Sequence, residues 1–175
     1  VGFSMLGLFT AISPNFLGDI LNITNKAVIG VMVFLIFCAS TLGQLLFKSK
    51  SDYHILMLGS GTLIVGVILV GLSIQFESFL ILFIGAIISG FGQAFSFRAG
   101  LSTVNAVAPE DKQAEITSTF FTIAYIAISI PVVGVGLLEL GLGIKLAGIV
   151  FSIIIVILAI LSLILLLANK KKSNS

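Results

Sequence analysis

The sequence predicts an all-α integral membrane protein with six transmembrane helices. Charged residues make up only 9% of the 175-residue chain, against roughly 25% in soluble domains. The nine basic and seven acidic residues are distributed so that six long stretches carry no charge. In the run 148–168, polar and apolar residues do not alternate, as they would in the strands of a membrane β-barrel. These three observations favour helices that cross a bilayer.

The six uncharged stretches define the expected helices. Five of them are 19 to 23 residues long, and a helix needs roughly 20 apolar residues to cross the hydrocarbon core. The first has 17 residues and opens without Met, so we expect residues 1–175 to be a single transmembrane domain from a longer chain. The connections are too short to hold a soluble domain. The stretches are Val1–Leu17, Ala27–Phe47, Ile55–Ile74, Phe79–Phe97, Ile116–Leu138 and Leu146–Ala168.

Polar side chains are concentrated in the first, fourth and fifth stretches. Such groups are costly in a bilayer unless they are paired or hydrated, so they tend to face the interior of a bundle. We therefore expect these three helices to line a cavity, to which the second helix contributes a glutamine. Amide side chains need several hydrogen-bond partners, and packing between helices is the alternative role for them. The predicted substrate-binding residues are Asn15, Gln44, Gln93 and Tyr125.

The remaining helices differ in character. Small residues four apart, such as Gly85 and Ser89, allow helix backbones to approach closely. Pro14 and Pro131 interrupt the first and fifth helices and, with 18 glycines in the chain, favour a protein that moves over a static anchor. The last stretch is almost purely Ile, Leu and Val, so we expect it to face lipid.

The basic residues predict an orientation in the cell membrane. Lys and Arg in short connections mark the cytoplasmic side. If the first helix starts inside, the cytoplasmic segments hold seven basic residues and the outside connections hold only Lys26 and Lys145. Both ends of the segment are then cytoplasmic. The seven are Lys48, Lys50, Arg98, Lys112, Lys170, Lys171 and Lys172.

Few residues could support other chemistry. Cys38 is the only cysteine and His54 the only histidine, so we expect no disulfide, metal site or cofactor. The basic residues lie at membrane edges and do not indicate nucleic-acid binding. An intramembrane serine protease would need a Gly-x-Ser-Gly nucleophile and a histidine base within the membrane, and the sequence has neither. We therefore expect that the chain is not an enzyme.

The segment from Gly85 to Leu138 resembles a known family. It contains GFGQAFSFRAGLSTVNAVAPEDKQAEITSTFFTIAYIAISIPVVGVG, which is similar to the tenth and eleventh helices of a major facilitator superfamily transporter. In that family a glycine-rich helix runs into a cytoplasmic loop with a proline, an acidic and a basic residue, here Pro109, Glu110 and Lys112. At the end of the second stretch and just after it, Gly43 and Lys48 match parts of the family's Gly-x-x-x-Asp-Arg signature, and Phe47 stands at its acidic position.

The resemblance implies the C-terminal half of a twelve-helix transporter. Its two inverted three-helix repeats would be residues 1–74 and 79–168. Its partners would be the lipid bilayer, a small-molecule substrate and an N-terminal six-helix half. It would move a small organic solute by alternating access. Outward transport of amphiphiles is the favoured direction, because the chain offers no dense hydrogen-bonding site for a sugar. The alternatives are a self-contained six-helix protein that acts as a homodimer or partner subunit, and an intramembrane enzyme.

Overall fold

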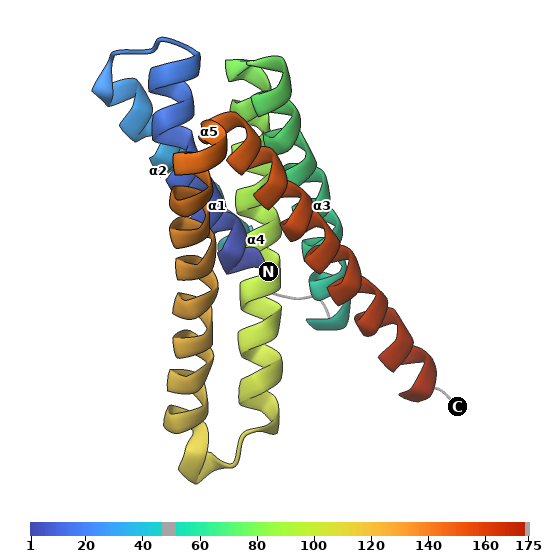
Figure 1. Ribbon diagram of the computed structural model, residues 1–175. Coiled ribbons are helices and arrows are strands. Elements are labelled where there is room, and N and C mark those ends of the chain that lie inside the picture. The colour runs from blue at the N-terminus through green and yellow to red at the C-terminus, as the bar shows by residue number, and fades with distance from the viewer. Residues whose placement is uncertain (47–51, 174–175) are drawn as a thin grey trace.

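The computed structural model describes residues 1–46 and 52–173, and every regular element in these ranges is helical. The chain begins with α1 and continues through a short π-helical turn, η1, into α2 (Figure 1). A 3-10 turn, η2, connects the last two long elements. The elements are α1 (Gly2–Asn15), η1 (Phe16–Ile20), α2 (Lys26–Leu46), α3 (Asp52–Phe76), α4 (Phe79–Val107), η2 (Glu110–Lys112) and α5 (Gln113–Ser173).

The element α5 consists of two arms that join at Gly143. This glycine has φ 75° and ψ 162°, which are not helical values, and this region of backbone conformation is open almost only to glycine. The chain reverses its direction at this point (Figure 1). We call residues 113–142 the first arm and residues 144–173 the second arm. They contain the fifth and sixth predicted helices.

The long helices have the length and composition of membrane spans. Four helical segments of the described residues are long and apolar enough to cross a bilayer: Lys26–Leu45, Tyr53–Phe76, Phe79–Val107 and Glu110–Ala168. The last of these includes both arms of α5. The helix α1 is shorter, with 14 residues. The all-helical prediction is confirmed, whereas six separate crossings stay a prediction.

The prediction was wrong about where the fourth helix ends. It was expected to end at Phe97, yet α4 continues past Arg98 to Val107. The residues of segment 98–107 are compatible with a helix, and α4 ends because Pro109 follows. Ala108 is extended, with φ −77° and ψ 130°, as expected for a residue that precedes proline. The expected loop Arg98–Glu115 is therefore mostly helical.

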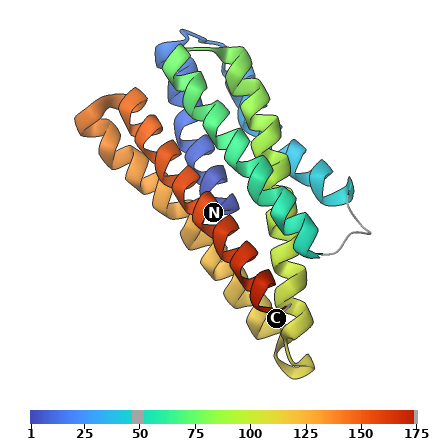
Figure 2. The same cartoon turned by 90° about the vertical axis from the view of Figure 1, so that its right-hand side faces the viewer.

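The turns of the chain gather at two ends of the bundle (Figures 1 and 2). The connections at 21–25 and 77–78 and the break at Gly143 lie at one end. The connection at 108–112 and the C-terminal end of α5 lie toward the other. We call these the Gly143 end and the Pro109 end.

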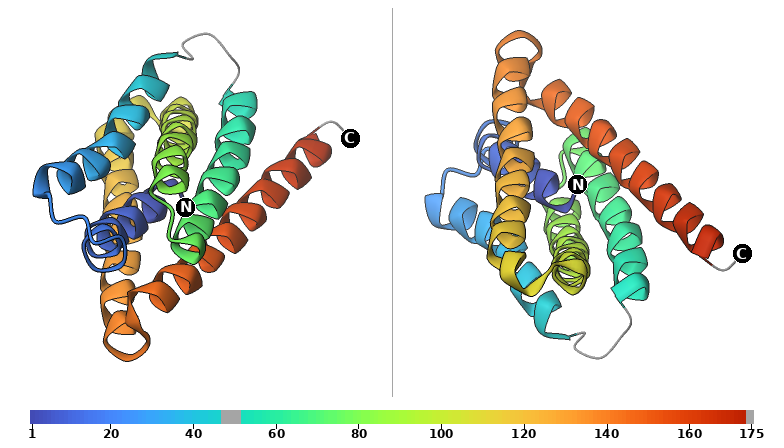
Figure 3. Two further views of the ribbon diagram at one scale, coloured as in Figure 1. Left: turned by 90° about the horizontal axis from the view of Figure 1, so that it is seen from above. Right: turned by 90° about the horizontal axis from the view of Figure 1, so that it is seen from below.

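The core of the bundle is built around α1. Met5, Leu8, Phe9, Ile12 and Phe16 are at most 1% exposed. They form one hydrophobic cluster with buried residues of α2, α3, α4 and α5. Viewed along the bundle, α2 and the second arm of α5 lie on opposite sides (Figure 3). The chain therefore places its first helix in the interior and leaves much of the last one exposed.

Small residues bring α3 and α4 into close contact, as the sequence predicts. A methyl group built on Gly92 would come within 2.5 Å of the Leu63 backbone nitrogen, and one on Gly59 within 2.8 Å of the Ser96 nitrogen. Gly66 of α3 lies directly against Ser89 of α4. Without a hydrophobic driving force between helices in lipid, this close packing is a main source of attraction.

Candidate functional site

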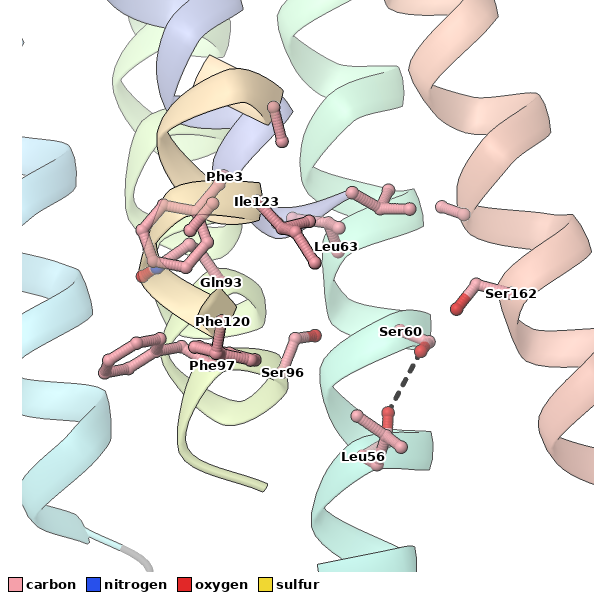
Figure 4. A pocket seen from close by; sticks show the side chains of 15 residues that line it. Phe3, Leu56, Ser60, Leu63, Gln93, Ser96, Phe97, Phe120, Ile123 and Ser162 are labelled. Atoms are coloured by element: carbon pink, nitrogen blue, oxygen red, sulfur yellow. Dashed lines mark hydrogen bonds between the residues drawn. The ribbon is translucent and has the colours of Figure 1, made fainter. Parts of the chain in front are cut away.

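A central cavity lies between helices α1, α3, α4 and both arms of α5. Its volume is about 240 Å³. Figure 4 shows the side chains around it. None of the described residues that line it has an ionisable side chain. The lining residues are Val1, Gly2, Phe3, Leu56, Ser60, Leu63, Gln93, Ser96, Phe97, Phe120, Ile123, Ala124, Ala127, Ala159 and Ser162.

One wall of the cavity is aromatic. The rings of Phe3 and Phe97 meet edge to face, with centroids 5.4 Å apart and planes at 78°. Phe97 also contacts Phe120 and Phe121, each with a centroid distance of 6.0 Å. These rings come from α1, α4 and the first arm of α5. Edge-to-face and tilted pairs at such distances are favourable, so the wall is held by contacts among its own rings.

Three serines supply polarity to the cavity. Ser60, Ser96 and Ser162 come from α3, α4 and the second arm of α5. The Ser60 hydroxyl donates to the Leu56 carbonyl at 3.0 Å, so its lone pairs are still available as acceptors. The cavity thus offers aromatic faces, apolar walls and a few hydroxyl groups.

The predicted residue Gln93 lines the cavity but turns its amide away from it. Gln93 is 3% exposed, and Figure 4 shows its amide group extending from α4 toward the side of α2. The Ser40 hydroxyl of α2 donates to Gln93 Oε1. Gln44 Nε2 donates in turn to Ser40 Oγ at 3.4 Å. The structure therefore brings two predicted residues together through Ser40, which was not among the predicted residues.

Arg98 adds a second link between α2 and α4. Its guanidinium Nη1 donates to the backbone carbonyl of Gln44 at 2.6 Å. Gln44 lies in the last turn of α2, where carbonyl groups have no partner within the helix. An arginine near this position satisfies such a carbonyl and is favoured by the helix dipole. Ser40, Gln44, Gln93 and Arg98 form what we call the α2–α4 polar cluster.

The other two predicted residues lie elsewhere. Asn15 is at the Gly143 end, where its Nδ2 donates to the Glu139 carboxylate at 3.1 and 3.3 Å. Tyr125 is 66% exposed and lines a shallow groove of about 650 Å³ on the first arm of α5. Its neighbours in that groove include Thr122, Ser129 and Ile130. The four predicted residues therefore occupy three separate places.

Several serine and threonine hydroxyls of the described residues are satisfied locally. Thr10, Ser73, Thr103, Thr122 and Ser129 each donate to a carbonyl three or four residues earlier in their own helix. This is the structural role that such residues often have in helices. The polar faces of α1 and of the first arm of α5 thus reflect backbone contacts as well as any contact with a solute.

The family of the chain follows from a comparison with known protein families. The sequence model of the Major Facilitator Superfamily matches residues 1–175. The chain belongs to the major facilitator superfamily. No curated protein and no solved structure matches it.

Membership in the major facilitator superfamily has direct consequences. It makes the chain a multi-pass membrane protein and a secondary transporter of the facilitator type. Members act in a lipid bilayer on small-molecule substrates and are not enzymes. Within the described residues, no group of three or more His, Cys, Asp or Glu side chains could hold a metal ion.

The family signatures fall on different parts of this structure. Pro109, Glu110 and Lys112 lie at the turn between α4 and α5. Gly43 packs against Ala94 of α4, so that an added methyl group would lie 2.7 Å from the Ala94 Cβ. Phe47 and Lys48, expected in the Gly-x-x-x-Asp-Arg-like segment, lie outside the described residues.

Several residues of the cavity were not predicted from the sequence. Phe91 and Phe95 form a tilted ring pair within α4, with centroids 6.2 Å apart. Phe95, however, belongs to a separate small cluster with Ile55, Ala94 and Ala99. The cavity instead uses Phe3, Phe97 and Phe120. Their spacing alone could not indicate this, because the three rings come from three different helices.

Proposed function

We propose that the chain moves a small organic solute across the cell membrane by alternating access, and that the central cavity forms part of its path. The observation that carries this proposal is the cavity itself. It lies between helices of a major facilitator superfamily member and presents aromatic rings and hydroxyl groups without ionisable side chains. A neutral or weakly polar aromatic solute fits such a lining, which agrees with the outward transport of amphiphiles expected from the sequence.

We further propose that this chain acts together with a second six-helix half. The first arm of α5 supports this, because Tyr125, Ile126, Ile130 and Val133 are each more than half exposed along one face. The same face carries the hydroxyl groups of Thr122, Tyr125 and Ser129, and polar groups in a membrane tend to face other helices or a cavity and not lipid. In this proposal the chain contributes six crossings, in two three-helix units at 1–74 and 79–168. Asn15, Gln44, Gln93 and Tyr125 remain candidate substrate contacts.

The proposal also includes the orientation of the bundle. The Pro109 end carries Lys112 and the C-terminal lysines, whereas Lys26 and Lys145 lie at the Gly143 end. The positive-inside rule then makes the Pro109 end cytoplasmic.

A dye-retention assay tests the proposed path. The protein is expressed in cells that are loaded with a panel of neutral and cationic aromatic dyes, and the loss of fluorescence is followed. Ala127→Trp places a large side chain in the cavity and is expected to slow the loss of any dye that the wild-type protein exports. Ala106→Trp, at an exposed position on α4, is the matched control. Equal export by both variants would contradict a path through the cavity.

A further inference from the structure

An elongated groove runs between α3 and the second arm of α5. Its volume is about 350 Å³. From α3 it is lined by Val67, Ile68 and Leu72, and from α5 by Ile149, Ile153 and Ile157. Ser152 supplies the one hydroxyl group among the described lining residues, and it donates to the Gly148 carbonyl at 2.8 Å. The groove is apolar along its length.

One end of the groove is polar. Gln75 lines it near the Gly143 end and is exposed. Glu77 follows Gln75 by two residues, and its Oε1 forms an ion pair with Lys145 Nζ at a distance of 2.9 Å. Lys145 stands one helical turn before the lining residue Ile149, on the same face of the second arm. Both charged side chains are partly exposed, at 39% for Lys145 and 51% for Glu77.

We propose that this groove binds one membrane phospholipid, with an acyl chain between α3 and the second arm of α5 and a zwitterionic headgroup on the Lys145–Glu77 pair. The Lys145 ammonium has three donors, of which one is used by Glu77. The others can bind the lipid phosphate. The Glu77 carboxylate can accept from the ammonium group of the headgroup. The polar end and the apolar length thus match the two parts of a single lipid.

The charge pair determines which lipid is favoured. Acyl chains are as apolar in the bulk bilayer as in the groove, so burial alone gives little selectivity. Shape and the headgroup must supply it. A purely anionic headgroup would gain from Lys145 but would lie beside the Glu77 carboxylate. A headgroup with both a phosphate and an ammonium pairs with both side chains, which is why we assign a zwitterionic lipid.

Native mass spectrometry of the purified protein tests the site. The protein is extracted in detergent and exposed to an equal mixture of phosphatidylethanolamine and phosphatidylglycerol. We expect the wild-type protein to retain one phosphatidylethanolamine. Glu77→Gln should lose the preference for this lipid, and Lys145→Gln should reduce the retention of both. Lys26→Gln changes the first residue of α2, a helix on the side of the bundle opposite the second arm of α5 (Figure 3), and should behave as wild type.

Groove-filling variants test the position of the acyl chain. Ile153→Trp fills the groove and should reduce lipid retention severalfold, whereas Ile154→Trp, which changes an exposed neighbour outside the lining, should not. Photolabelling of the wild-type protein with a lipid that carries a reactive group in its acyl chain should mark residues 149–157. Equal retention by both tryptophan variants would overturn the proposal. So would labelling outside these residues and α3, or a wild-type protein that retains no lipid or prefers phosphatidylglycerol.

Discussion

At the scale of single residues, the missing side chains of glycine set how closely the helices of this transporter approach each other. Gly7 of α1 lies directly against the Ile128 carbonyl in the first arm of α5. A methyl group on Gly90 of α4 would lie 2.6 Å from the Ile36 carbonyl oxygen of α2. Any larger side chain at these positions must push two backbones apart. The glycines therefore fix the positions of the helices that surround the cavity.

Gly7→Ala should destabilise the protein. The added methyl group would overlap the Ile128 backbone, and overpacking of this kind costs about 1–3 kcal/mol. Thermal unfolding in detergent measures the effect. Gly30→Ala is the control, because a methyl group there has no atom within 4 Å and alanine favours the helix by about 0.5–1 kcal/mol. If Gly7→Ala were as stable as Gly30→Ala, the close approach of α1 and α5 would be refuted.

The hydrogen bond between Ser40 and Gln93 should show coupling in a double-mutant cycle. Ser40→Ala leaves the buried Gln93 oxygen without its partner, and Gln93→Leu removes the acceptor. The coupling energy between the two changes should be about 0.6 kcal/mol, the average that such cycles give in a membrane protein, and at most about 1.7 kcal/mol. The double variant should lose less than the sum. Unfolding in detergent measures the cycle, with Ser129→Ala as a control for a locally bonded hydroxyl. Strict additivity would show that this bond is absent.

At the scale of the element, α5 consists of two helical arms joined at a single residue with a non-helical backbone conformation, Gly143. Gly143 turns the chain so that its two arms can pack against each other, and Gly134 of the first arm lies directly against the Phe151 ring of the second. The charge-free stretches 116–138 and 146–168 each lie within one helical arm, because length and hydropathy are properties of the chain alone. The residue at which the chain reverses could not be predicted in this way, because it is defined by the backbone dihedral angles of Gly143.

Gly143→Ala should weaken the reversal. Alanine at these dihedral angles costs of the order of 1–3 kcal/mol, so the unfolding temperature of the variant should fall below that of the wild type. Gly141→Ala lies two residues earlier, without a positive φ and with open space around it. It should be neutral or slightly stabilising. A stable Gly143→Ala protein beside a destabilised Gly141→Ala protein would place the break elsewhere.

At the scale of the whole molecule, the arrangement of helices decides which predicted residues meet. The sequence correctly indicated an all-helical membrane bundle, the close packing of small residues and the family. It did not indicate that Gln93 would turn toward Ser40 or that Asn15 would pair with Glu139, since both contacts join helices that are distant in sequence. It also placed the end of α4 too early, because a charge at Arg98 was read as a membrane boundary. The arginine is instead paired with a carbonyl of α2.

The orientation of the bundle can be measured with single cysteines. In a Cys38→Ala background, Thr24→Cys and Asp111→Cys place one thiol at each end. A membrane-impermeant maleimide should label Thr24→Cys on intact cells and Asp111→Cys only after the membrane is permeabilised, because the basic residues favour a cytoplasmic Pro109 end. The reverse pattern would invert the proposed topology.

The most direct test of the transport path asks whether water-soluble reagents reach the cavity. Ser96→Cys in the Cys38→Ala background places a thiol on the cavity wall, and Val70→Cys, at a position that is 0% exposed, is the buried control. The purified protein in proteoliposomes is treated with a small hydrophilic thiol reagent, and the labelled fraction is measured by mass spectrometry. Alternating access predicts that Ser96→Cys is labelled and Val70→Cys is not. A Ser96→Cys protein that stays as unreactive as Val70→Cys would contradict a solute path through this cavity.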